Sequence, residues 1–285
     1  MDPDFIIVRY GELFLKGRNR RFFERKLIDN IKKKFNLSTI YRLQGRLMLN
    51  YFQGHASLRD IFGLVSYSPA WKAESDLSSI QEQALAIVHG KKGTFRVMTK
   101  RSDKNFPLTS IELNRVVGKY IEENSNLIFA METPDQTLYI EINEKGVYLF
   151  TKVVPCHGGI PTGAEGKVLL LLEDDASVVA GILMMKRGAF VVPVSFQETI
   201  LENKKRISLL QKFSPVKLNI IAVASLPDLE NYAVAHQISV LVTGESFQEL
   251  ALSTKKLSPA TLIIFRPLIS YSQEEIISQL EIFSH

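Results

Sequence analysis

The sequence predicts a protein of several domains, in which two α+β segments precede an open α/β layer built on a parallel sheet. Strand-like runs and helix-like stripes alternate over residues 5–71 and again over residues 74–151. Residues 152–166 then contain four glycines and two prolines, a composition typical of connecting segments. From Lys167 onward, apolar strand-like runs alternate with segments of helix length, which is the pattern of a parallel α/β sheet.

A ferredoxin-like domain is predicted for residues 1–72 from the order of its elements. A strand over residues 5–9 precedes a basic helix that ends near Phe35, for which Asn19 is the candidate N-cap. Apolar residues recur every four positions along this helix and predict one buried stripe. The stripe consists of Phe23, Leu27, Ile31 and Phe35. A β-α-β-β-α-β order is completed by strands over residues 39–43 and 46–52 around a turn at Gln44-Gly45, a short helix near 56–60 and a strand near 63–71.

The second segment, residues 73–152, again mixes helices with strands. Its pattern predicts helices over residues 76–89 and 109–123, a strand over 94–99, and a hairpin formed by residues 137–142 and 146–150. Residues 153–166 are predicted to form a linker or a mobile loop because of their glycines and prolines.

The third segment, residues 167–285, is predicted to fold as one open α/β layer of the Rossmann-like kind. Its five strand-like runs are apolar enough for the central strands of a parallel sheet. They are residues 167–172, 189–196, 217–224, 238–242 and 261–265. Ligands of such sheets bind beyond the carboxyl ends of the strands, where residues 173–177 (EDDAS) form the first elbow.

The composition is that of an ordinary folded protein. Hydrophobic residues make up 46% of the chain and charged residues 23%, which excludes a mainly disordered chain. No apolar run approaches the roughly 20 residues that span a bilayer, and the N-terminus does not resemble a signal peptide. We therefore expect a cytoplasmic protein with no membrane partner. The single cysteine, Cys156, excludes an intramolecular disulfide and argues against a cysteine-based metal site.

Positive charge is concentrated at the N-terminal end. Residues 1–50 hold twelve Lys or Arg against five Asp or Glu, whereas residues 161–285 hold eleven against thirteen. Cations also occupy the loop and first turn of the basic helix, where each opposes the helix dipole at a cost of roughly 0.3–1 kcal/mol. They are Lys16, Arg18, Arg20 and Arg21. This placement favours a polyanionic partner; the alternative is a solvated basic helix.

The elbow at residues 173–177 stands where a phosphate-binding strand-turn-helix needs glycines, so that backbone N–H groups can close on the anion. It carries Glu173, Asp174 and Asp175 instead, and then Ser177. One carboxylate about 4 Å from one phosphate charge costs about 4 kcal/mol at an effective dielectric near 20. The elbow is therefore predicted to be a degenerate nucleotide site whose acids cap the next helix; the alternative is a Mg²⁺ site that holds nucleotide phosphates.

Three separated stretches resemble the tRNA 4-thiouridine synthetases, also called tRNA sulfurtransferases. They are RYGELFLKGRNRRFFE at residues 9–24, TFRVMTKRSDKNFPLTSIELNRVVGKYI at residues 94–121, and KVLLLL, LMMKRG, LVTGES and RPLI between residues 167 and 269. The middle stretch is similar to a THUMP domain, a module that this family uses to bind RNA. The resemblance implies that the N-terminal and THUMP domains hold the acceptor end of tRNA, and family precedent implies a homodimer.

Eight residues carry the THUMP pattern KR.DK.FP..S.E. They are Lys100, Arg101, Asp103, Lys104, Phe106, Pro107, Ser110 and Glu112. We expect Lys100, Arg101 and Lys104 in a loop just beyond a strand, where long cationic side chains reach phosphates. Phe106 is expected to be a core residue rather than a base-stacking one.

The third stretch departs from the family, whose C-terminal domain resembles PP-loop pyrophosphatases and binds ATP with a Ser-Gly-Gly-x-Asp-Ser elbow. Here Glu173 and Asp174 replace the two glycines, Ala176 replaces the Asp, one residue is missing, and Ser177 alone is kept. The His-Ser-Pro-Pro loop and the arginine-rich helix with its reactive cysteine are absent, and Ser272 replaces the Asp that follows RPLI. TGES and RPLI therefore indicate ancestry, with structural roles in turn and core.

Together, these features predict a tRNA-binding THUMP protein with a degenerate, non-catalytic PP-loop-type domain, no catalytic residue, no metal and no cofactor. The alternative is an active tRNA sulfurtransferase that uses ATP, Mg²⁺ and a persulfide sulfur donor to convert uridine to 4-thiouridine. A third hypothesis is a subunit that assists a separate sulfurtransferase or sulfur carrier. Cys156, beside His157, is interpreted as an inert linker thiol, since no second cysteine exists to resolve a persulfide.

Overall fold

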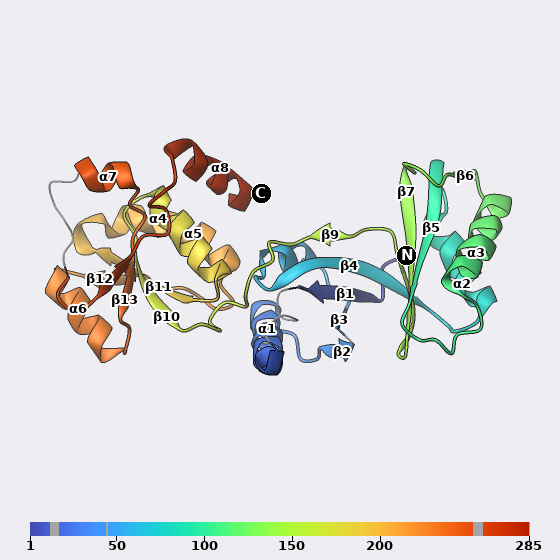
Figure 1. Cartoon of the computed structure of the whole chain (residues 1–285), viewed down its shortest axis with the longest axis horizontal. Coiled ribbons are helices and arrows are strands. Elements are labelled where there is room, and N and C mark those ends of the chain that lie inside the picture. The colour runs from blue at the N-terminus through green and yellow to red at the C-terminus, as the bar shows by residue number, and fades with distance from the viewer. Residues whose placement is uncertain (12–16, 44, 253–258, 285) are drawn as a thin grey trace. The chain divides into compact units, whose positions relative to one another are not determined.

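The computed structural model describes residues 1–11, 17–43, 45–252 and 259–284, which divide into two compact units (Figure 1). The first unit comprises Met1–Arg9, Thr39–Ala56 and Ser66–Pro155. The second comprises Tyr10–Ser38, Ser57–Val65 and Cys156–His285. Residues before position 72 thus contribute to both units, and the predicted boundaries at 72, 152 and 166 stay predictions.

The described strands of the first unit form one sheet in the order β2-β3-β1-β4-β8-β7-β5-β6, with β9 paired to β4. Within it, β1 pairs antiparallel with β3, and Ile7 lies opposite Met48. The predicted ferredoxin-like element order is confirmed, with a 3₁₀ helix as its second helix. Its elements are β1 (Phe5–Tyr10), α1 (Arg20–Phe35), β2 (Tyr41–Leu43), β3 (Arg46–Asn50), η2 (His55–Asp60) and β4 (Leu64–Ala73). Gln44 of the predicted turn lies outside the described residues.

The same sheet continues into the strands of the second segment. The first half of β4 pairs with β9 at Ser66 and Tyr67, and its last residues, from Trp71, pair with β8. The remaining elements are α2 (Leu77–Val88), β5 (Gly93–Arg101), α3 (Ser110–Asn124), β6 (Leu127–Phe129), β7 (Gln136–Asn143), β8 (Gly146–Phe150) and β9 (Val154–Pro155). Both helices pack their apolar stripes on one face of this part of the sheet, including Ile80, Val117 and Ile121. The other face carries a core around Ile7, Met48, Tyr148 and Phe150.

A buried ion-pair group ties β1 and β3 to β7. Arg9 donates to Oε1 of Glu141 at 3.1 Å, and Arg46 pairs with Oε2 of the same carboxylate. Burial lowers the pKa of Arg9 and of Arg46 to about 10. One carboxylate between two guanidinium groups fixes three strands in register, and removing it would leave two cations in a partly buried site without their partner.

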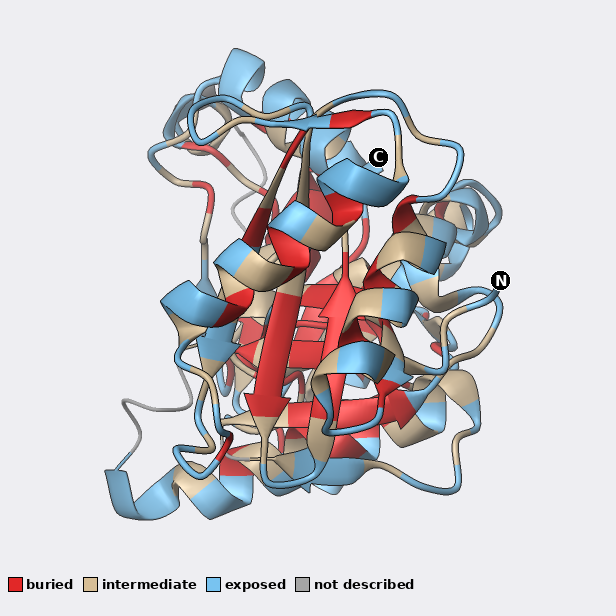
Figure 2. Cartoon of the chain, turned by 90° about the vertical axis from the view of Figure 1, so that its right-hand side faces the viewer, coloured by how far each residue is buried: buried red, intermediate tan, exposed pale blue. Residues whose placement is uncertain are grey.

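The second unit is built on a parallel sheet in the order β12-β11-β10-β13-β14. Its elements are β10 (Lys167–Leu171), α4 (Asp175–Lys186), β11 (Phe190–Phe196), η3 (Gln197–Thr199), α5 (Ile200–Phe213), β12 (Ile221–Val223), α6 (Leu226–Ala235), β13 (Val240–Val242), α7 (Phe247–Leu252), β14 (Ile263–Phe265) and α8 (Gln273–Ser284). Helices α4, α5 and α8 cover one face and α6 covers the other. Figure 2 shows buried strands and helices whose outer faces are exposed. The expectation of five central strands is wrong for β12 and β14, because an open sheet has two edges, and Ile263 at one edge is 66% exposed.

Helix α1 belongs to this second unit, and two of its polar side chains, Asn30 and Lys34, bond to carbonyls of the C-terminal part of the chain. Leu27 and Ile31 are fully buried, and the amide of Asn30 donates to the carbonyl of Thr162 at 2.9 Å. The ammonium of Lys34 donates to three carbonyls at the C-terminal end of α5, those of Gln211, Lys212 and Ser214. This cation satisfies carbonyls that a helix end leaves without intrahelical partners. Asn19 occupies the N-cap position of α1 with an αR backbone and no side-chain cap bond, so its predicted capping role is wrong.

Residues 156–166 are held by backbone hydrogen bonds. Gly158 donates to the carbonyl of Leu64 at 2.8 Å, Ile160 to that of Lys186 at 2.9 Å, and Glu165 to that of Gly188 at 3.0 Å. A Cβ atom at Gly159 would lie 2.5 Å from the carbonyl oxygen of Lys186, and its φ is +81°. Gly159 therefore serves a close approach of two backbones, within a connection held by backbone hydrogen bonds.

Candidate functional site

The acidic elbow lies at the point of the parallel sheet where the strand order reverses. Strand β10 has β11 on one side and β13 on the other. In open α/β sheets, ligands bind at this switch point, beyond the carboxyl ends of the strands. The loop between β10 and α4 meets there the loop that follows β13, residues 243–246. The fold thus places Glu173, Asp174 and Asp175 where this class of sheet accepts a ligand.

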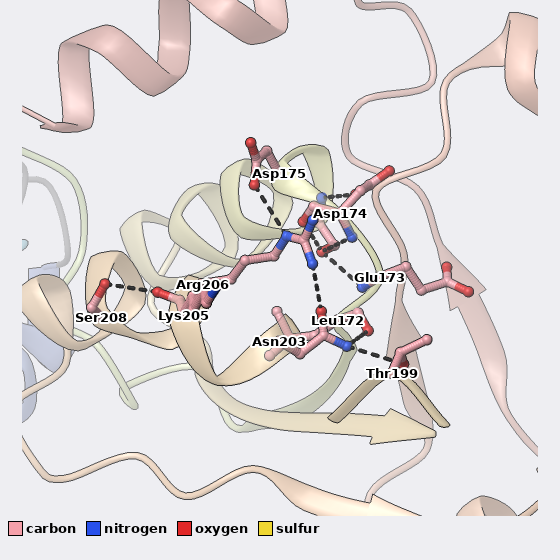
Figure 3. A network of polar contacts seen from close by, with 10 residues as sticks. Leu172, Glu173, Asp174, Asp175, Thr199, Asn203, Lys205, Arg206 and Ser208 are labelled. Carbon is pink, nitrogen blue, oxygen red and sulfur yellow. Dashed lines mark hydrogen bonds and ion pairs between the residues drawn. The ribbon is translucent and has the colours of Figure 1, made fainter. Parts of the chain in front are cut away.

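The backbone of the elbow is bonded to its own side chains (Figure 3). Asp174 is the N-cap of α4, and its Oδ1 accepts from the N–H of Ser177 at 2.8 Å. The hydroxyl of Ser177 accepts from the N–H groups of Glu173 and Asp174 at 3.2 and 3.3 Å and donates to the Asp174 carbonyl at 2.6 Å. This is a capping box, and it confirms the interpretation of the elbow as a helix cap for Asp174 alone among the three acids. Three N–H groups that an anion could use are bonded internally.

The loop after β13 covers the first turn of α4. A Cβ atom at Gly244 would lie 2.4 Å from the nitrogen of Ser177 and 2.7 Å from the carbonyl carbon of Ala176. Real Cβ atoms do not approach so closely, so only glycine permits this contact of two backbones. Thr243 and Ser246 on either side are buried at 1% and 3% exposure. The loop after β13 therefore occupies the space directly against Ala176 and Ser177, whereas Glu173, Asp174 and Asp175 are exposed.

The three carboxylates of the elbow point in different directions (Figure 3). Asp174 turns back to cap α4, and Asp175 accepts from Nε of Arg206 at 3.1 Å. Desolvation by the surrounding loops raises the pKa of Glu173, and the carboxylates of Asp174 and Glu245 raise it further. Over the described parts of the chain, no three His, Cys, Asp or Glu side chains gather in a way that could hold a metal ion.

Behind the elbow lies a buried polar network centred on Asn203, which sequence reasoning missed (Figure 3). Its amide nitrogen donates to the carbonyl of Leu172 at 2.7 Å, to the Ser195 hydroxyl at 2.8 Å and to the Thr199 hydroxyl at 3.3 Å. Its Oδ1 accepts from Arg206 at 3.0 Å, and Asn203 is fully buried. The sequence held one sign of this network: Asn203 lies seven positions, or about two helical turns, before Leu210 and therefore on the same buried face of α5. The network joins the ends of β10 and β11 to α5.

Residues 5–68 match the family model described as the ThiI ferredoxin-like domain, and residues 74–152 match that of the THUMP domain. A probable tRNA sulfurtransferase of Mycoplasmopsis synoviae is 32% identical over 312 residues, which cover 96% of this chain and 82% of the relative. The chain belongs to the tRNA sulfurtransferase family. The Staphylococcus epidermidis member is 31% identical over 328 residues, 98% of this chain and 80% of the relative.

Two solved structures share the fold of this sulfurtransferase-family chain over 99% of its length. PH1313 from Pyrococcus horikoshii has a TM-score of 0.87 and 28% identity, with 100% of its chain covered. A 4-thiouridine synthetase in a complex with RNA and bound ATP has a TM-score of 0.86 and 26% identity, with 85% of its chain covered. These comparisons confirm the predicted fold classes. An alignment of 328 positions against 285 residues leaves at least 43 positions of the Staphylococcus relative without a counterpart here.

The sequence motifs kept from the family contact one another. Glu245 of TGES accepts from Nε of Arg266 of RPLI at 2.8 Å and from the Thr243 hydroxyl at 3.0 Å. Ser272, which follows RPLI, accepts from the N–H of Glu275 at 3.2 Å, in the first turn of α8. These residues hold loops and a helix end. The N–H groups of Glu173, Asp174 and Ser177 are bonded within the elbow, and Gly244 lies against the first turn of α4.

Of the predicted RNA-binding cations of the N-terminus, Arg20 and Arg21 begin α1 and Arg18 lies in the turn before it. Lys16 lies outside the described residues. Arg18 and Arg21 are exposed, whereas Arg20 is partly buried beside Tyr10 and Glu24. The first turn of α1 holds no acidic residue. Arg18 and Arg21 thus remain at a helix N-terminus, where the dipole disfavours them.

The cations of the THUMP pattern occupy the end of β5 and the turn after it. Lys100 and Arg101 are the last two residues of the strand, so the prediction that they lie in a loop is wrong, and Lys104 alone lies in the turn. The guanidinium of Arg101 donates to the carbonyls of Phe106 and Leu108, both at 2.7 Å. Phe106 is 8% exposed and belongs to the core, as expected. Lys100 and Lys104 are exposed cations, while Arg101 also shapes the loop.

Cys156 and His157 form no activated thiol. Burial raises the pKa of Cys156 to about 12, which keeps the thiol protonated and poorly nucleophilic. His157 lies against the rings of Phe62, Phe213 and Phe283. Burial, together with the charges of Arg59, Lys186 and Lys212, lowers the pKa of His157 to about 4. The pair therefore has the properties of packing residues.

Proposed function

We propose that this chain binds the acceptor region of tRNA through its ferredoxin-like and THUMP domains, and that its C-terminal domain is non-catalytic and uses neither ATP nor Mg²⁺. One observation carries the proposal. The N–H groups of Glu173, Asp174 and Ser177 are bonded within a capping box, and Gly244 packs on the same helix turn. A phosphate cradle needs such groups free and pointing at the anion.

Three features support the RNA half of the proposal. The chain belongs to the tRNA sulfurtransferase family, and a related 4-thiouridine synthetase was solved in a complex with RNA. Residues 1–50 carry the excess of positive charge. Arg18, Arg21, Lys100 and Lys104 are exposed, so their side chains are available to phosphates.

The RNA half is tested by measuring tRNA affinity at several salt concentrations. Each phosphate contact adds about one unit to the slope of log affinity against log salt. Arg18→Gln with Arg21→Gln should lower that slope by about two. The matched control is Lys204→Gln with Lys205→Gln, which removes two exposed cations of α5 and should leave the slope unchanged. Equal slopes for both double variants would exclude the N-terminal cations from the interface.

The catalytic half is tested by incubating the protein with tRNA, ATP, Mg²⁺ and a sulfide source. We expect no pyrophosphate release, no thiolated uridine, and no heat of ATP binding in calorimetry. Either product would establish the alternative, an active tRNA sulfurtransferase. Thiolation that appears only when a separate sulfurtransferase or sulfur carrier is added would assign the chain to the role of an assisting subunit.

A further inference from the structure

One edge of β5 is open over most of its length. Strand β7 pairs with β5 over Phe95–Arg101, whereas β6 pairs with its other side only over Gly93–Phe95. Beyond Phe95, none of the described strands lies on that side. An open edge presents backbone donors and acceptors that a further strand can bond. One of these backbone donors is already bonded, because the N–H of Thr99 donates to Oδ1 of Asn114 in α3 at 2.8 Å. The part of the edge that stays open is therefore centred on Val97.

A groove of about 640 Å³ separates this edge from α3. Four large apolar side chains line it while exposed to solvent: Met98 at 43%, Ile111 at 80%, Phe129 at 44% and Met131 at 77%. Such a concentration of exposed apolar surface on a folded protein marks an interaction site.

Gly118 forms part of the groove and costs α3 stability. A glycine inside a helix is less stable than alanine by roughly 0.5–1 kcal/mol. A Cβ atom at Gly118 would meet its nearest neighbours, side-chain atoms of Phe129 and Val97, at 3.9 and 4.0 Å, which is ordinary contact. Neither packing nor backbone conformation therefore requires glycine here. Its effect is to keep the groove deep.

The groove has a cationic rim. Arg96, Arg115 and Lys119 line it together with one carboxylate, that of Glu122. Glu122 is already engaged, because it accepts from the N–H of Phe129 at 3.1 Å, and Lys119 has only an exposed pair with Glu123 at 3.6 Å. Exposed pairs of this kind are weak. The rim therefore complements acidic side chains.

We propose that this groove binds an extended, acidic and apolar segment of a partner protein, which adds to the edge of β5 as a further strand. Its alternate apolar side chains lie between β5 and α3, and its Asp or Glu side chains face Arg115 and Lys119. A nucleic-acid strand fits less well, because bases need stacking platforms and Phe129 is the single aromatic side chain of the lining. The site goes beyond tRNA binding and depends on neither half of the proposed function.

The probe is a displayed library of random peptides of about seven residues, long enough at about 3.3 Å per residue to follow the open edge. The full chain is the target. We expect enriched sequences that alternate apolar residues with Asp or Glu. Enrichment should be lost with Gly118→Leu, which fills the groove, and with Arg115→Glu, which reverses an exposed rim charge. Lys92→Glu, at an exposed position outside the lining, is the matched control and should keep the enrichment.

The best peptide is then synthesised with and without N-methyl groups on alternate residues, which remove backbone donors. We expect binding to be at least tenfold weaker for one of the two alternate N-methylation patterns, as an added strand requires. Equal binding of all forms, enrichment that persists with Gly118→Leu and Arg115→Glu, or no enriched sequence would overturn the proposal. Two other results would also overturn it. If the protein binds a short single-stranded RNA that the peptide displaces, and Arg115→Glu weakens that RNA binding, the groove is an RNA site. If the protein self-associates and Gly118→Leu abolishes the self-association, the groove binds a second copy of the chain.

Discussion

Replacing Ser177 by alanine tests whether the elbow is closed by its own side chains. The Ser177 hydroxyl makes three hydrogen bonds, to the N–H groups of Glu173 and Asp174 and to the carbonyl of Asp174. Ser177 is fully buried, so water cannot take its place. Each bond contributes about 0.5–1.5 kcal/mol net. Because two of the bonds are long, at 3.2 and 3.3 Å, we expect a total loss of about 2 kcal/mol.

Hydrogen exchange measured by mass spectrometry over residues 167–186 is the assay for this loss. The one tryptophan, Trp71, lies in the other compact unit, so its fluorescence does not follow this domain. A loss of about 2 kcal/mol should speed exchange through local opening by roughly thirtyfold. Ser208→Ala is the matched control, because Ser208 is exposed on α5 and makes one bond, to the Lys205 carbonyl. Its effect should stay within about 0.5 kcal/mol.

Equal exchange in the Ser177→Ala and Ser208→Ala proteins would refute the closed elbow. The same variant also separates geometry from charge. Freed N–H groups should still bind no ATP, because the carboxylates of Glu173 and Asp174 stay near them and each opposes a phosphate charge by about 4 kcal/mol at 4 Å. ATP binding by Ser177→Ala alone would show that the hydrogen bonds, and not the charges, exclude the nucleotide.

Three further changes give distinct outcomes. Asn203→Asp removes the donor to the Leu172 carbonyl and places a carboxyl group in a buried site, where its pKa should rise. Urea unfolding followed by circular dichroism should show a destabilised protein. Its stability should increase as the pH falls towards 4, because the buried carboxyl group becomes protonated. The pKa of His157 is lowered to about 4 in the folded protein, so between about pH 6.5 and 4 the unfolded chain binds a proton that the folded chain does not. The free energy of unfolding should therefore fall as the pH drops from about 6.5 to 4. In thermal unfolding, His157→Leu should remove that part of the pH dependence. Gly118→Ala should raise the melting temperature, corresponding to a gain of about 0.5–1 kcal/mol; a lower melting temperature would mean that α3 cannot accept the methyl group.

The sequence by itself determined the features that depend on residues close together in the chain. The stripe of Leu27 and Ile31 predicted a buried helix face, and both residues are fully buried. Helices α2 and α3 begin and end within two residues of their predicted bounds. The acidic elbow was interpreted as a cap because the helix dipole favours acidic residues in a first turn, and Asp174 is the N-cap of α4.

The tertiary structure decided which surfaces meet. The pairing of β4 with β8 joins strands about 75 residues apart, and the stripe of α1 gave no sign that Lys34 would end on the carbonyls of α5. Gly244 lies against Ser177 although 67 positions separate them in the sequence. The spacing of apolar residues along the sequence shows that one face of a helix or strand is buried, but it does not show which element covers that face. Non-local contacts leave no local pattern, because their partners are brought together by chain topology and packing rather than by neighbouring residues.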